Sequence, residues 1–460
     1  MSAVFEQIRE NVERRPQRSP AATLTSLIAT RAASIGVIGM GYVGLPLAKA
    51  IGEQRFSVVG FDADKDKVKA LNAGESYIKH IGSRSIAALR TTGRFSATAD
   101  FARLADCDVI LICVPTPLNK HREPDLSFVV STAKSIRRHL RRGQLIVLES
   151  TTYPGTTTEV VRPVLETSGL KSGVDFFLAY SPEREDPGNI NFSTPGIPKV
   201  VGGDGAAAAK LATALYSALI SKVVPVSSLA TAEAVKLTEN IFRAVNIALV
   251  NELKLVYGAM GIDIWEVIEA AKTKPFGYMA FYPGPGLGGH CIPIDPFYLS
   301  WKAREFEVPT RFIELAGEIN NAMPRFVVER LSTALDRTTH RGLNGANILL
   351  MGIAYKKNVD DLRDSPSLKL IELIEERGGR ADFYDPFIPL VPRTRDHPQL
   401  TGRKSIAWDH ARIASYDAVV IATDHDGIDY AGLSLTAKLI VDTRNALHRA
   451  GVADGRVVKA

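Results

Sequence analysis

The chain has 460 residues, of which 45% are hydrophobic and 23% are charged, and its formal net charge is +6. This composition predicts a soluble globular protein with two to four domains. No apolar run is long enough to span a bilayer, and charged residues interrupt the apolar stretches near the N-terminus, so we expect neither membrane insertion nor a signal peptide. The positive charge is spread along the chain, which favours anionic small ligands weakly and gives no support for a nucleic-acid partner.

The three cysteines of the chain are Cys107, Cys113 and Cys291. They have neither the paired spacing of a metal site nor the pattern of a disulfide framework. Thiols stay free in reducing compartments. We therefore predict a cytoplasmic protein without a metal site.

Residues 1–31 carry five arginines and three glutamates with little regular apolar spacing. We expect a frayed or partly helical extension of unknown function. At Ser34 the pattern changes, because an apolar strand leads into a glycine turn, a helix and a second apolar strand that ends at Asp62.

The glycine turn has the pattern of a dinucleotide-binding site. Gly39, Gly41 and Gly44 form G-x-G-x-x-G between strand and helix, and Asp62 follows 23 residues after Gly39. Such a turn brings the backbone close to a pyrophosphate at the helix N-terminus, and the carboxylate binds the ribose hydroxyls. Because Asp62 would repel a 2′-phosphate, the pattern predicts NAD rather than NADP. The predicted cofactor contacts in this region also include Tyr42, Val43 and Lys67.

Apolar strand-like runs recur at residues 109–114, 145–148 and 177–179, and helix-like segments such as 128–140 alternate with them. This alternation predicts an α/β fold with a doubly wound parallel sheet. In such a sheet, ligands bind beyond the carboxyl ends of the strands. The polar residues that follow these strands are therefore expected to line the cofactor crevice.

Three strand ends carry candidate site residues. Thr116 follows the first run, and Thr151 lies in a hydroxyl-rich stretch after the second. Ordinary turn capping explains each of these hydroxyls equally well. After the third run, residues 180–189 contain several acids and Arg184, and most such charges are solvated. Glu183 is the acid closest to the strand end.

Residues 231–261 have the apolar spacing of one long helix. Lys236 and Asn240 are four residues apart, so they share one face of it. A lysine and an amide together could stabilise a developing oxyanion, although a solvated helix face is the simpler explanation for the two residues alone. This helix is also a natural connector between two domains and a natural surface for homo-oligomerisation.

Residues 282–298 read YPGPGLGGHCIPIDPFY. No regular helix or strand tolerates this mixture of glycine and proline, so we predict a shaped loop. Cys291 lies in this loop, and Asp295 follows four residues later. A thiol on a rigid loop suggests a nucleophile beside a closely approached ligand, whereas a buried cysteine in a turn is the commoner case.

A second α/β pattern follows in the last third of the chain. An apolar strand at residues 347–355, a helix after Pro366 and later strands repeat the outline of the first pattern. The second pattern lacks G-x-G-x-x-G, so we do not expect a second dinucleotide site. Its turn carries Lys356, Lys357 and Arg363, which suit phosphate contact but are also ordinary surface residues.

Taken together, these motifs resemble those of the UDP-glucose and UDP-N-acetylhexosamine 6-dehydrogenases. In chain order the markers are GMGYVGLP, the Thr-Pro-Leu-Asn turn, STTYPGT, YSPER, EAVKLTEN, GPGLGGHCIPIDP and AYKKNVDDLRDSPS. The resemblance implies two Rossmann-like doubly wound domains joined by a long central helix. The expected parts are an N-terminal extension (1–31), an NAD-binding domain (32–228), a central helical domain with the cysteine loop (229–337) and a UDP-sugar-binding α/β domain (338–460).

The resemblance also implies a four-electron oxidation. The C6 alcohol of a UDP-sugar would be taken to a carboxylate by two hydride transfers to NAD. The thiolate of Cys291 would add to the intermediate aldehyde, and the second oxidation would leave a thioester for hydrolysis.

By similarity, the other candidates acquire roles in this chemistry. Lys236 and Asn240 would stabilise the oxyanion, and Asp295 would support a network of water and lysine. Thr151 would position water, and Glu183 would serve hydrolysis or proton transfer.

The same resemblance assigns residues to the substrate. The backbone of residues 284–289 would hold the nucleotide portion, and the turn around Tyr355 would approach the uridine diphosphate. Arg363 resembles an arginine that reaches the cofactor region. The predicted substrate contacts are Glu183, Arg184, Lys236, Asn240, Tyr282, Gly284, Gly286, Gly288, Tyr355, Lys356 and Lys357.

Two departures from the UDP-glucose enzymes bear on the substrate. Pro187 stands where those enzymes have a second glutamate, and HCIPIDP lacks the lysine that usually precedes the aspartate. Both features resemble the branch that acts on UDP-N-acetylglucosamine or its epimers, which predicts a UDP-N-acetylglucosamine 6-dehydrogenase. The residue that serves as the acid or base could be Glu183, Glu185 or Asp186.

Three other functions are alternatives to a UDP-N-acetylglucosamine 6-dehydrogenase. They are a UDP-glucose 6-dehydrogenase, a two-electron hydroxyacid dehydrogenase and a catalytically silent nucleotide-sugar-binding subunit.

Overall fold

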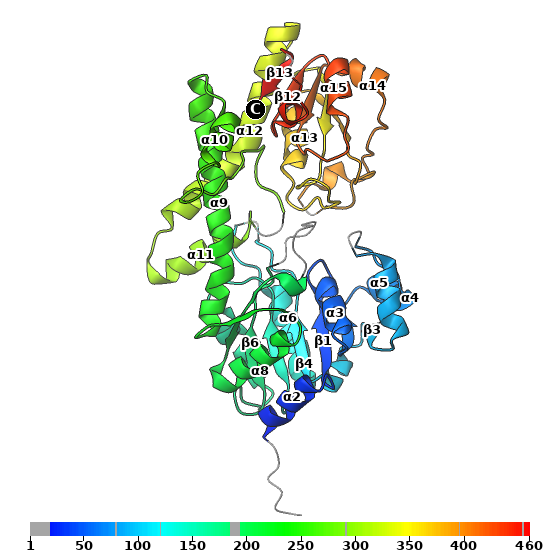
Figure 1. Cartoon of the computed structure of the whole chain (residues 1–460), viewed down its shortest axis with the longest axis vertical. Coiled ribbons are helices and arrows are strands. Elements are labelled where there is room, and N and C mark those ends of the chain that lie inside the picture. The colour runs from blue at the N-terminus through cyan, green and yellow to red at the C-terminus, as the bar shows by residue number, and fades with distance from the viewer. Residues whose placement is uncertain are drawn as a thin grey trace, which may run out of the picture. The chain divides into compact units, whose positions relative to one another are not determined.

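The computed structural model describes residues 19–78, 81–119, 121–184, 194–289, 292–394, 396–452 and 455–460. The chain divides into two compact units. The first unit comprises residues 1–116 and 125–236, and the second comprises residues 117–124 and 237–460. Each unit is built around one sheet with helices on both faces (Figure 1).

The described sheet of the first unit has the strand order β3-β2-β1-β4-β5-β6-β7-β8. This is a doubly wound arrangement, which confirms the predicted fold class. Its strands are β1 (Ser34–Ile38), β2 (Ser57–Phe61), β3 (Phe95–Thr98), β4 (Val109–Ile112), β5 (Leu145–Leu148), β6 (Phe177–Tyr180), β7 (Lys199–Gly203) and β8 (Val223–Pro225).

One strand pair departs from the expected parallel arrangement. β7 runs antiparallel to β6, with Ala179 opposite Gly203, while the other neighbouring strands of this sheet are parallel. A parallel neighbour requires a crossover connection, usually a helix, whereas an antiparallel neighbour does not. No α-helix is assigned between β6 and β7 in the described residues. The antiparallel direction of β7 is consistent with a connection from β6 that contains no crossover α-helix in the described residues.

Helices cover both faces of this sheet, and its central strands are accordingly buried on both sides. Ile35 and Val37 belong to one hydrophobic core and Ile38 to the other, as expected for alternate side chains of a parallel strand. The helices are α2 (Pro20–Ala29), α3 (Gly44–Glu53), α4 (Lys65–Ala73), α5 (Ser83–Thr91), α6 (Ser127–His139), α7 (Arg162–Glu166) and α8 (Gly205–Ser217), with short turns η1 (Phe101–Asp106), η2 (Thr157–Val161) and η3 (Thr194–Gly196).

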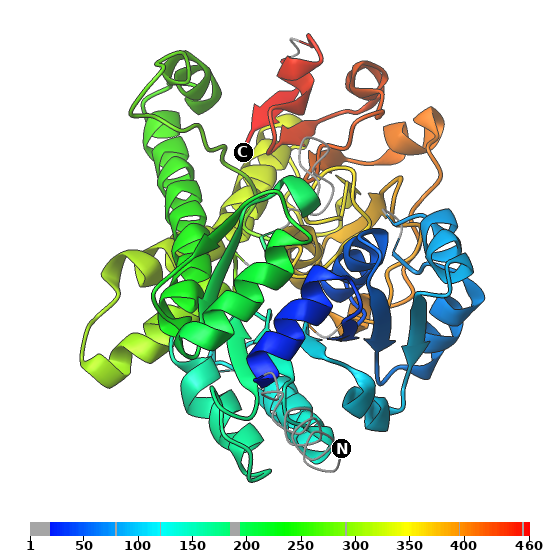
Figure 2. The ribbon, with the colours of Figure 1, turned by 60° about the horizontal axis from the view of Figure 1, so that its bottom comes forward.

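The described end of the N-terminal extension is part of the first core. Ser19 caps α2 by accepting a hydrogen bond from the backbone N–H of Ala22. Leu24 and Ile28 of this helix are buried, and α2 packs on α8 (Figure 2). The helical part of the extension therefore stabilises the first unit.

The second unit begins within the long helix α9 (Leu229–Ala259), which starts in the first unit. Its five-stranded sheet has the order β10-β9-β11-β12-β13, and all described neighbours are parallel. The further elements are α10 (Ile264–Ala271), α11 (Asp295–Ala303), η4 (Arg304–Phe306), α12 (Arg311–Thr339), β9 (Asn347–Met351), α13 (Pro366–Glu376), β10 (Arg380–Tyr384), η5 (Pro398–Leu400), α14 (His410–Ser415), β11 (Ala418–Ile421), α15 (Tyr430–Thr436), β12 (Ile440–Asp442), α16 (Ala446–Arg449) and β13 (Val457–Lys459).

The predicted long central helix is thus confirmed as α9. In the described part of the chain, no helix combines the length and the hydropathy that crossing a membrane requires.

Candidate active site

The glycine turn after β1 is shaped by close contacts within the first unit. Gly39 has a φ of 91°, and a Cβ there would lie 2.5 Å from the carbonyl oxygen of Cys113. A Cβ on Gly44, the first residue of α3, would lie 1.9 Å from the carbonyl oxygen of Gly39. Packing therefore requires glycine at both positions.

Gly41 is different, because a Cβ there would meet no protein atom within 4 Å. Open space beside this backbone is what a closely approaching ligand needs. Val43 precedes α3 and makes no side-chain capping hydrogen bond to it, and both Val43 and Tyr42 pack against the core. The N-terminus of a helix favours an anion. The turn therefore fits the pyrophosphate of a dinucleotide.

Asp62, directly after β2, is fixed beside this turn. Its Oδ2 accepts a hydrogen bond from the Met40 N–H at 3.0 Å, and its Oδ1 accepts one from the Asp64 N–H at 2.9 Å. Lys67 Nζ lies 3.6 Å from Oδ2. The Tyr77 hydroxyl donates to the Met40 carbonyl oxygen. Burial, together with the carboxylates of Asp62 and Asp64, raises the pKa of Tyr77. The carboxylate is thus held where the ribose of a bound dinucleotide is expected.

Thr116 and Thr151 follow β4 and β5, and Thr116 is buried whereas Thr151 is partly exposed. The loop that carries Thr151 is tied to α9 by Glu233. This buried carboxylate accepts hydrogen bonds from the backbone N–H groups of Gly155 and Thr157, at 2.6 and 2.8 Å. The loop is therefore fixed by tertiary contacts beyond local turn capping.

Glu183, after β6, belongs to a buried ionic cluster. Lys199 Nζ on β7 lies 2.9 Å from Glu183 Oε2 and 2.6 Å from Glu149 Oε2, and Tyr216 also donates to Glu149. Burial raises the pKa of Glu149, and Lys199 opposes that rise. Burial disfavours the charge on Lys199, but the two carboxylates outweigh it and raise its pKa. A single ammonium thus holds two carboxylates.

Arg184, the next residue, is held by the same segment. Its backbone N–H donates to Glu183 Oε1 at 2.6 Å, and its Nη1 donates to the carbonyl oxygen of Pro198 at 2.6 Å. The guanidinium therefore has a protein partner beside β7. Glu185 and Asp186, the other acids considered for proton transfer, lie outside the described residues.

Lys236 and Asn240 are both buried on α9, so the solvated helix face considered for them is wrong. Lys236 lies in the first unit, and Asn240 lies one turn later in the second. Asn240 Nδ2 donates to Oδ2 of Asp295 at 2.5 Å, and Asp295 is the first residue of α11. The helix face thus carries a buried lysine and an amide that is oriented by a buried carboxylate.

The glycine loop of the second unit packs against the turn after β9. The Gly289 N–H donates to the Arg363 carbonyl at 2.9 Å. A Cβ on Gly288 would lie 2.7 Å from Cβ of Tyr355, and one on Gly286, whose φ is 136°, would lie 3.1 Å from Cβ of Pro366. These glycines allow the loop to lie directly on the turn, which brings several predicted substrate residues together.

The start of the same loop is held by α9 and α12. The Gly284 N–H donates to Oδ1 of Asn251 at 3.0 Å. Asn251 in turn donates to Oδ1 of Asn320 at 3.0 Å, and Asn320 donates to the Ala244 carbonyl at 3.1 Å. On the other side, a Cβ on Gly284 would lie 2.6 Å from Nη1 of Arg444. The position of Gly284 is therefore determined by three elements.

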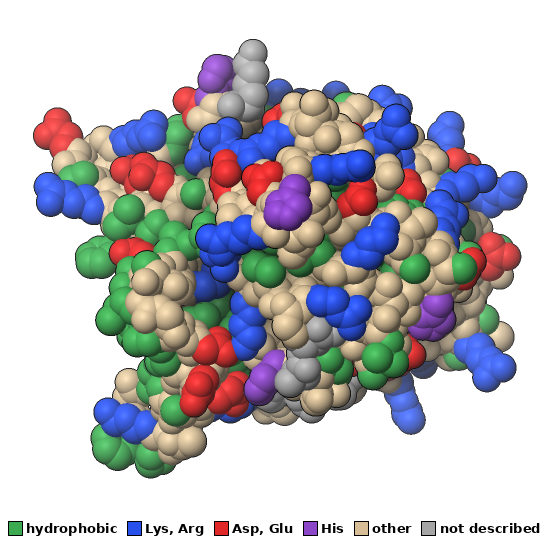
Figure 3. Space-filling model, turned by 90° about the horizontal axis from the view of Figure 1, so that it is seen from above, with side chains coloured by type: hydrophobic (Ala, Val, Ile, Leu, Met, Phe, Trp, Pro, Cys, Tyr) green, Lys and Arg blue, Asp and Glu red, His purple; other side chains and the backbone are tan. Residues whose placement is uncertain are grey.

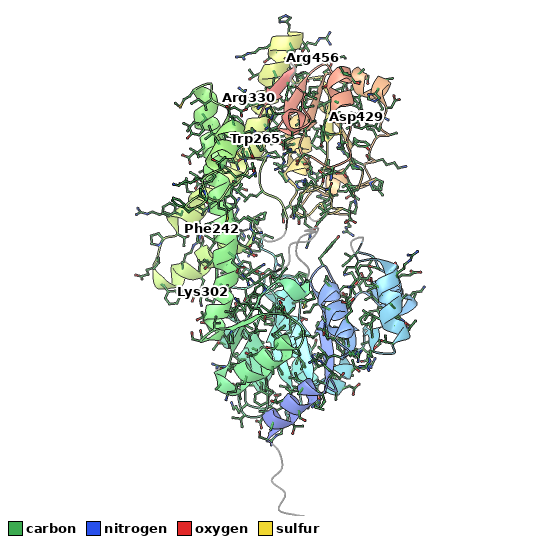
Figure 4. The ribbon with its side chains drawn as sticks, viewed as in Figure 1. Phe242, Trp265, Lys302, Arg330, Asp429 and Arg456 are labelled. Atoms are coloured by element: carbon green, nitrogen blue, oxygen red, sulfur yellow. The ribbon has the colours of Figure 1, made fainter. Side chains whose placement is uncertain are left out.

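Tyr282 is turned toward α10. Its ring stacks on Trp265 with centroids 5.7 Å apart, and its hydroxyl donates to Glu269 Oε1 at 2.6 Å. Trp265 is labelled in Figure 4. The structure thus gives Tyr282 a packing role at the start of the loop, separate from the glycines that follow.

The basic residues of the turn after β9 have protein partners. Arg363 forms a bidentate pair with Asp361, the shortest distance being 2.6 Å. Lys357 is half exposed and lies 3.2 Å from Asp426 Oδ1. Lys356 is partly buried. A phosphate at this turn would therefore compete with existing ion pairs for Arg363 and Lys357.

Cys291, the predicted nucleophile, lies outside the described residues, as does His290. The chain is fixed on both sides of them, by the backbone hydrogen bond of Gly289 and by the Asn240–Asp295 pair. The other two cysteines are free and buried. Burial raises the pKa of Cys107 to about 11 and also raises that of Cys113, so both are core residues.

Sequence reasoning missed several residues of this region, namely Glu149, Lys199, Tyr216, Glu233, Asn251, Asn320 and Arg444. Most of them are polar residues within strands or helices, where a solvated position is the default expectation. One signal was available for Lys199, because a lysine that opens an apolar run is unusual for a central strand. Their partners are distant in sequence, so the pairing itself could not be read from the sequence.

Comparison with protein families identifies three consecutive matches. Residues 33–220 match the NAD-binding domain of the UDP-glucose/GDP-mannose dehydrogenase family, residues 230–322 match its central domain, and residues 349–449 match its UDP-binding domain. The chain is also 36% identical to the UDP-N-acetyl-D-glucosamine 6-dehydrogenase of Pseudomonas aeruginosa, over 88% of this chain and 93% of that protein. The chain belongs to the UDP-glucose/GDP-mannose dehydrogenase family.

Two further relatives bear on the substrate. The UDP-N-acetyl-D-mannosamine dehydrogenase of Pyrococcus horikoshii is 35% identical over 90% of this chain and 96% of that protein. A structure of UDP-D-ManNAc dehydrogenase from the same organism superimposes with a TM-score of 0.82 at 32% identity, covering 93% of this chain and 98% of that one. An NDP-N-acetyl-D-galactosaminuronic acid dehydrogenase from Methanosarcina mazei matches with a TM-score of 0.77 at 28% identity, covering 96% and 98%.

Family membership confirms the predicted enzyme class, an NAD-dependent UDP-sugar dehydrogenase, and the predicted cofactor, NAD. The two-electron hydroxyacid dehydrogenase considered as an alternative is wrong. The family match also confirms a UDP-binding domain in the C-terminal part of the enzyme. The relatives are named for different sugars, N-acetylglucosamine and N-acetylmannosamine. The sugar that this enzyme oxidises and the roles of its individual residues therefore stay predictions.

Proposed function

We propose that the enzyme oxidises the C6 alcohol of UDP-N-acetylglucosamine to the carboxylate. The observation that carries this proposal is the hydrogen-bonded pair of buried residues Asn240 and Asp295. Asn240 lies on α9, which also holds buried Lys236, and Asp295 lies four residues after Cys291 in the chain. Such a group of side chains suits a reaction at a carbonyl, because it offers positive charge and an oriented amide to a developing oxyanion.

The proposed reaction has three chemical stages. Oxidation of the alcohol gives an aldehyde, a hydride and a proton. The thiolate of Cys291 adds to the aldehyde, and removal of a second hydride from the hemithioacetal gives a thioester. Water then hydrolyses the thioester to the carboxylate and returns the thiol. NAD would supply the hydride acceptor, one molecule for each of the two oxidations.

The residues have the following proposed roles in these stages. Lys236 and Asn240 stabilise the oxyanion that forms when the thiolate adds to the aldehyde and when water attacks the thioester. Asp295 is a positioning residue, because it fixes the orientation of the Asn240 amide. Glu183 handles the proton of hydrolysis, and Lys199 holds its carboxylate in place. Thr151 positions water at the end of β5.

The preference for UDP-N-acetylglucosamine is supported by the Pseudomonas aeruginosa relative and by the sequences PEREDPGN and HCIPIDP. UDP-N-acetylmannosamine is a second candidate, because the Pyrococcus horikoshii relative is almost as similar. UDP-glucose and a silent nucleotide-sugar-binding subunit are the remaining alternatives.

A substrate panel tests the proposed function. The purified enzyme is incubated with NAD and UDP-N-acetylglucosamine, its galacto or manno epimer, or UDP-glucose, and NADH and uronate are measured per sugar consumed. We expect UDP-N-acetylglucosamine to be preferred and to yield two NADH. Preference for another sugar would overturn the substrate, and inactivity on all of them would support the silent subunit.

The Cys291→Ser variant tests the covalent route. It should bind NAD and the UDP-sugar but fail to complete the four-electron oxidation, because a serine hydroxyl is not ionised at neutral pH. Cys113→Ser is the control, since Cys113 is buried in the first core. Normal uronate production by Cys291→Ser would sink the covalent mechanism.

We also propose that the enzyme is a homo-oligomer that associates through α9. Phe242, Leu249 and Val256 are seven residues apart on this helix, and each is about half exposed. This spacing places them in one stripe. Phe242 is labelled in Figure 4, and hydrophobic side chains gather along the left side of Figure 3. Light scattering of Leu249→Glu should show a smaller species, whereas Leu435→Glu, an isolated exposed leucine, should not change the mass.

A further inference from the structure

Lys254 on α9 is a buried cation in an unusual environment. Its side chain is 8% exposed, and among the described residues its Nζ has no hydrogen-bond partner. A buried ammonium without a partner is unfavourable by several kcal/mol. Burial, together with the smaller effects of the positive charges of Arg444 and Arg330, lowers the pKa of Lys254 to about 7.

The groups that face Lys254 come from two other elements of the second unit. On α12, the ring of Phe326 lies 5.2 Å from Nζ, and Arg330 follows one turn later (Figure 4). Arg444 follows β12, and its Nε donates to the Ala422 carbonyl at 2.9 Å. The described charges that act on the pKa of Lys254 are both positive. Three basic side chains therefore gather at one place.

This basic cluster adjoins the start of the glycine loop. Asn251 lies three residues before Lys254 on α9, so the two side chains share one face of the helix. Asn251 accepts the hydrogen bond of the Gly284 N–H, and Nη1 of Arg444 lies 2.6 Å from the position that a Cβ of Gly284 would take. The unpartnered amine of Lys254 is therefore next to the loop expected to hold the nucleotide.

We propose that Lys254 is a proton-linked recognition residue for the anionic diphosphate of the nucleotide sugar. The inference rests on the proposed function, because it takes a UDP-sugar as the ligand of this unit. A diphosphate would supply the acceptor that Nζ lacks and would offset the charges of Arg330 and Arg444. The neutral amine of Lys254 would take one proton from solvent as the ligand binds, and no other bond would change.

The proposal fixes the sign of a pH effect. Above the pKa of the free enzyme, Lys254 is neutral before binding and charged afterwards, so binding takes up a proton and weakens as the pH rises. Below that pKa, Lys254 is already charged before the ligand binds, and its protonation no longer makes the affinity for the UDP-sugar depend on pH. A purely structural lysine would stay neutral in both states and would show neither effect.

Titration calorimetry tests this inference on the full-length enzyme. UDP-N-acetylglucosamine is titrated without NAD at about pH 6 and about pH 8.5, in buffers of different ionisation enthalpy, and UDP-glucose is run beside it. Both ligands carry the same diphosphate, whose charge is constant over this range. We expect wild type to take up close to one proton at the higher pH, to take up little at the lower pH, and to lose about tenfold or more in affinity between them.

Lys254→Met should abolish both the proton uptake and the pH dependence of the affinity. Lys254→Arg should abolish the uptake while binding at the higher pH is retained. Lys302→Met is the control, because Lys302 is a buried lysine of the same unit that is paired with Glu305 at 2.7 Å, and it should behave as wild type.

The outcomes separate this inference from the proposed function. Binding without proton uptake in wild type, or unchanged uptake in Lys254→Met, would overturn the role of Lys254 and leave the reaction intact. If Lys254→Met does not fold, the buffer dependence of wild type decides alone. A wild-type enzyme that binds neither UDP-sugar would overturn the proposed function together with the inference.

Discussion

The side-chain amide of Asn240 lies 2.5 Å from the carboxylate of Asp295, joining the middle of α9 to the first residue of α11. An ionised carboxylate has no hydrogen to donate, so Asp295 can act toward this amide only as an acceptor. The Nδ2 of Asn240 therefore faces Asp295, and its Oδ1 points away. The contact therefore orients the group that is proposed to meet the oxyanion.

Asn240→Ala should lower kcat by about 10²- to 10³-fold, the usual effect of losing one oxyanion donor. The affinity for the UDP-sugar should change much less. Asn246→Ala is the matched control, because Asn246 lies on the same helix and its amide only donates to the Phe242 carbonyl. Steady-state kinetics and direct binding decide the point, and an equal loss in both variants would remove Asn240 from the reaction.

Lys199→Met should impair the enzyme by leaving Glu149 and Glu183 without their shared cation. One carboxylate of the pair should then hold a proton near neutral pH. We expect about tenfold or greater loss of kcat, an acid limb of the pH–rate profile moved to higher pH, and partial rescue by Lys199→Arg. Lys210→Met, an exposed lysine on α8, is the control. If the pH–rate profile of Lys199→Met matched that of wild type, Lys199 would have only a structural role.

Gly41→Ala and Gly44→Ala should separate cofactor binding from folding. A Cβ on Gly41 meets no protein atom within 4 Å, so the fold should tolerate it, while NAD should bind at least about tenfold more weakly. A Cβ on Gly44 would collide with the Gly39 carbonyl, so that variant should be destabilised by about 1–3 kcal/mol or more. Thermal unfolding and NAD titration distinguish the two. Wild-type NAD affinity in Gly41→Ala would contradict the assignment.

Gly288→Ala should displace the glycine loop from the turn after β9. Its Cβ would lie 2.7 Å from Cβ of Tyr355 and 3.0 Å from the Asp364 carbonyl oxygen, so the backbone must move. We expect a rise in KM for the UDP-sugar of about tenfold or more, because the loop is proposed to hold the nucleotide. Gly258→Ala near the end of α9 is the control, since its Cβ meets nothing within 4 Å and alanine favours a helix.

Lys254 should make the stability of the ligand-free enzyme depend on pH. Its folded pKa of about 7 is below the value in the unfolded chain, so the unfolded state binds more protons between these two values. Stability therefore rises with pH from about 7 toward about 10. Below pH 7 the lysine costs on the order of 3–5 kcal/mol. Lys254→Met should be more stable than wild type at pH 7, and this difference should shrink at pH 9. Urea unfolding at both pH values measures it, and a constant difference would show that Lys254 is charged throughout.

The local sequence determined the elements that carry the site. The alternation of apolar runs and helical segments predicted β1, β4, β5, β6 and α9, because burial on both faces of a parallel sheet requires continuous apolar strands. Likewise, G-x-G-x-x-G and Asp62 predicted the NAD site, because the demands of a pyrophosphate and a ribose fall within one strand-turn-helix-strand unit.

Only the tertiary structure decided which polar side chains are buried together. Asn240 and Asp295 are 55 residues apart, and Glu149 and Lys199 are 50 apart, so no local pattern relates them. The reversal of β7 brings Lys199 beside the end of β6, which a uniform parallel sheet would not predict. Helical spacing showed that Lys236 and Asn240 share a face but could not show that the face is buried. A lysine such as Lys254 reads as solvated in sequence, and only the fold, by enclosing it with Arg330 and Arg444, makes it a candidate for proton-linked binding.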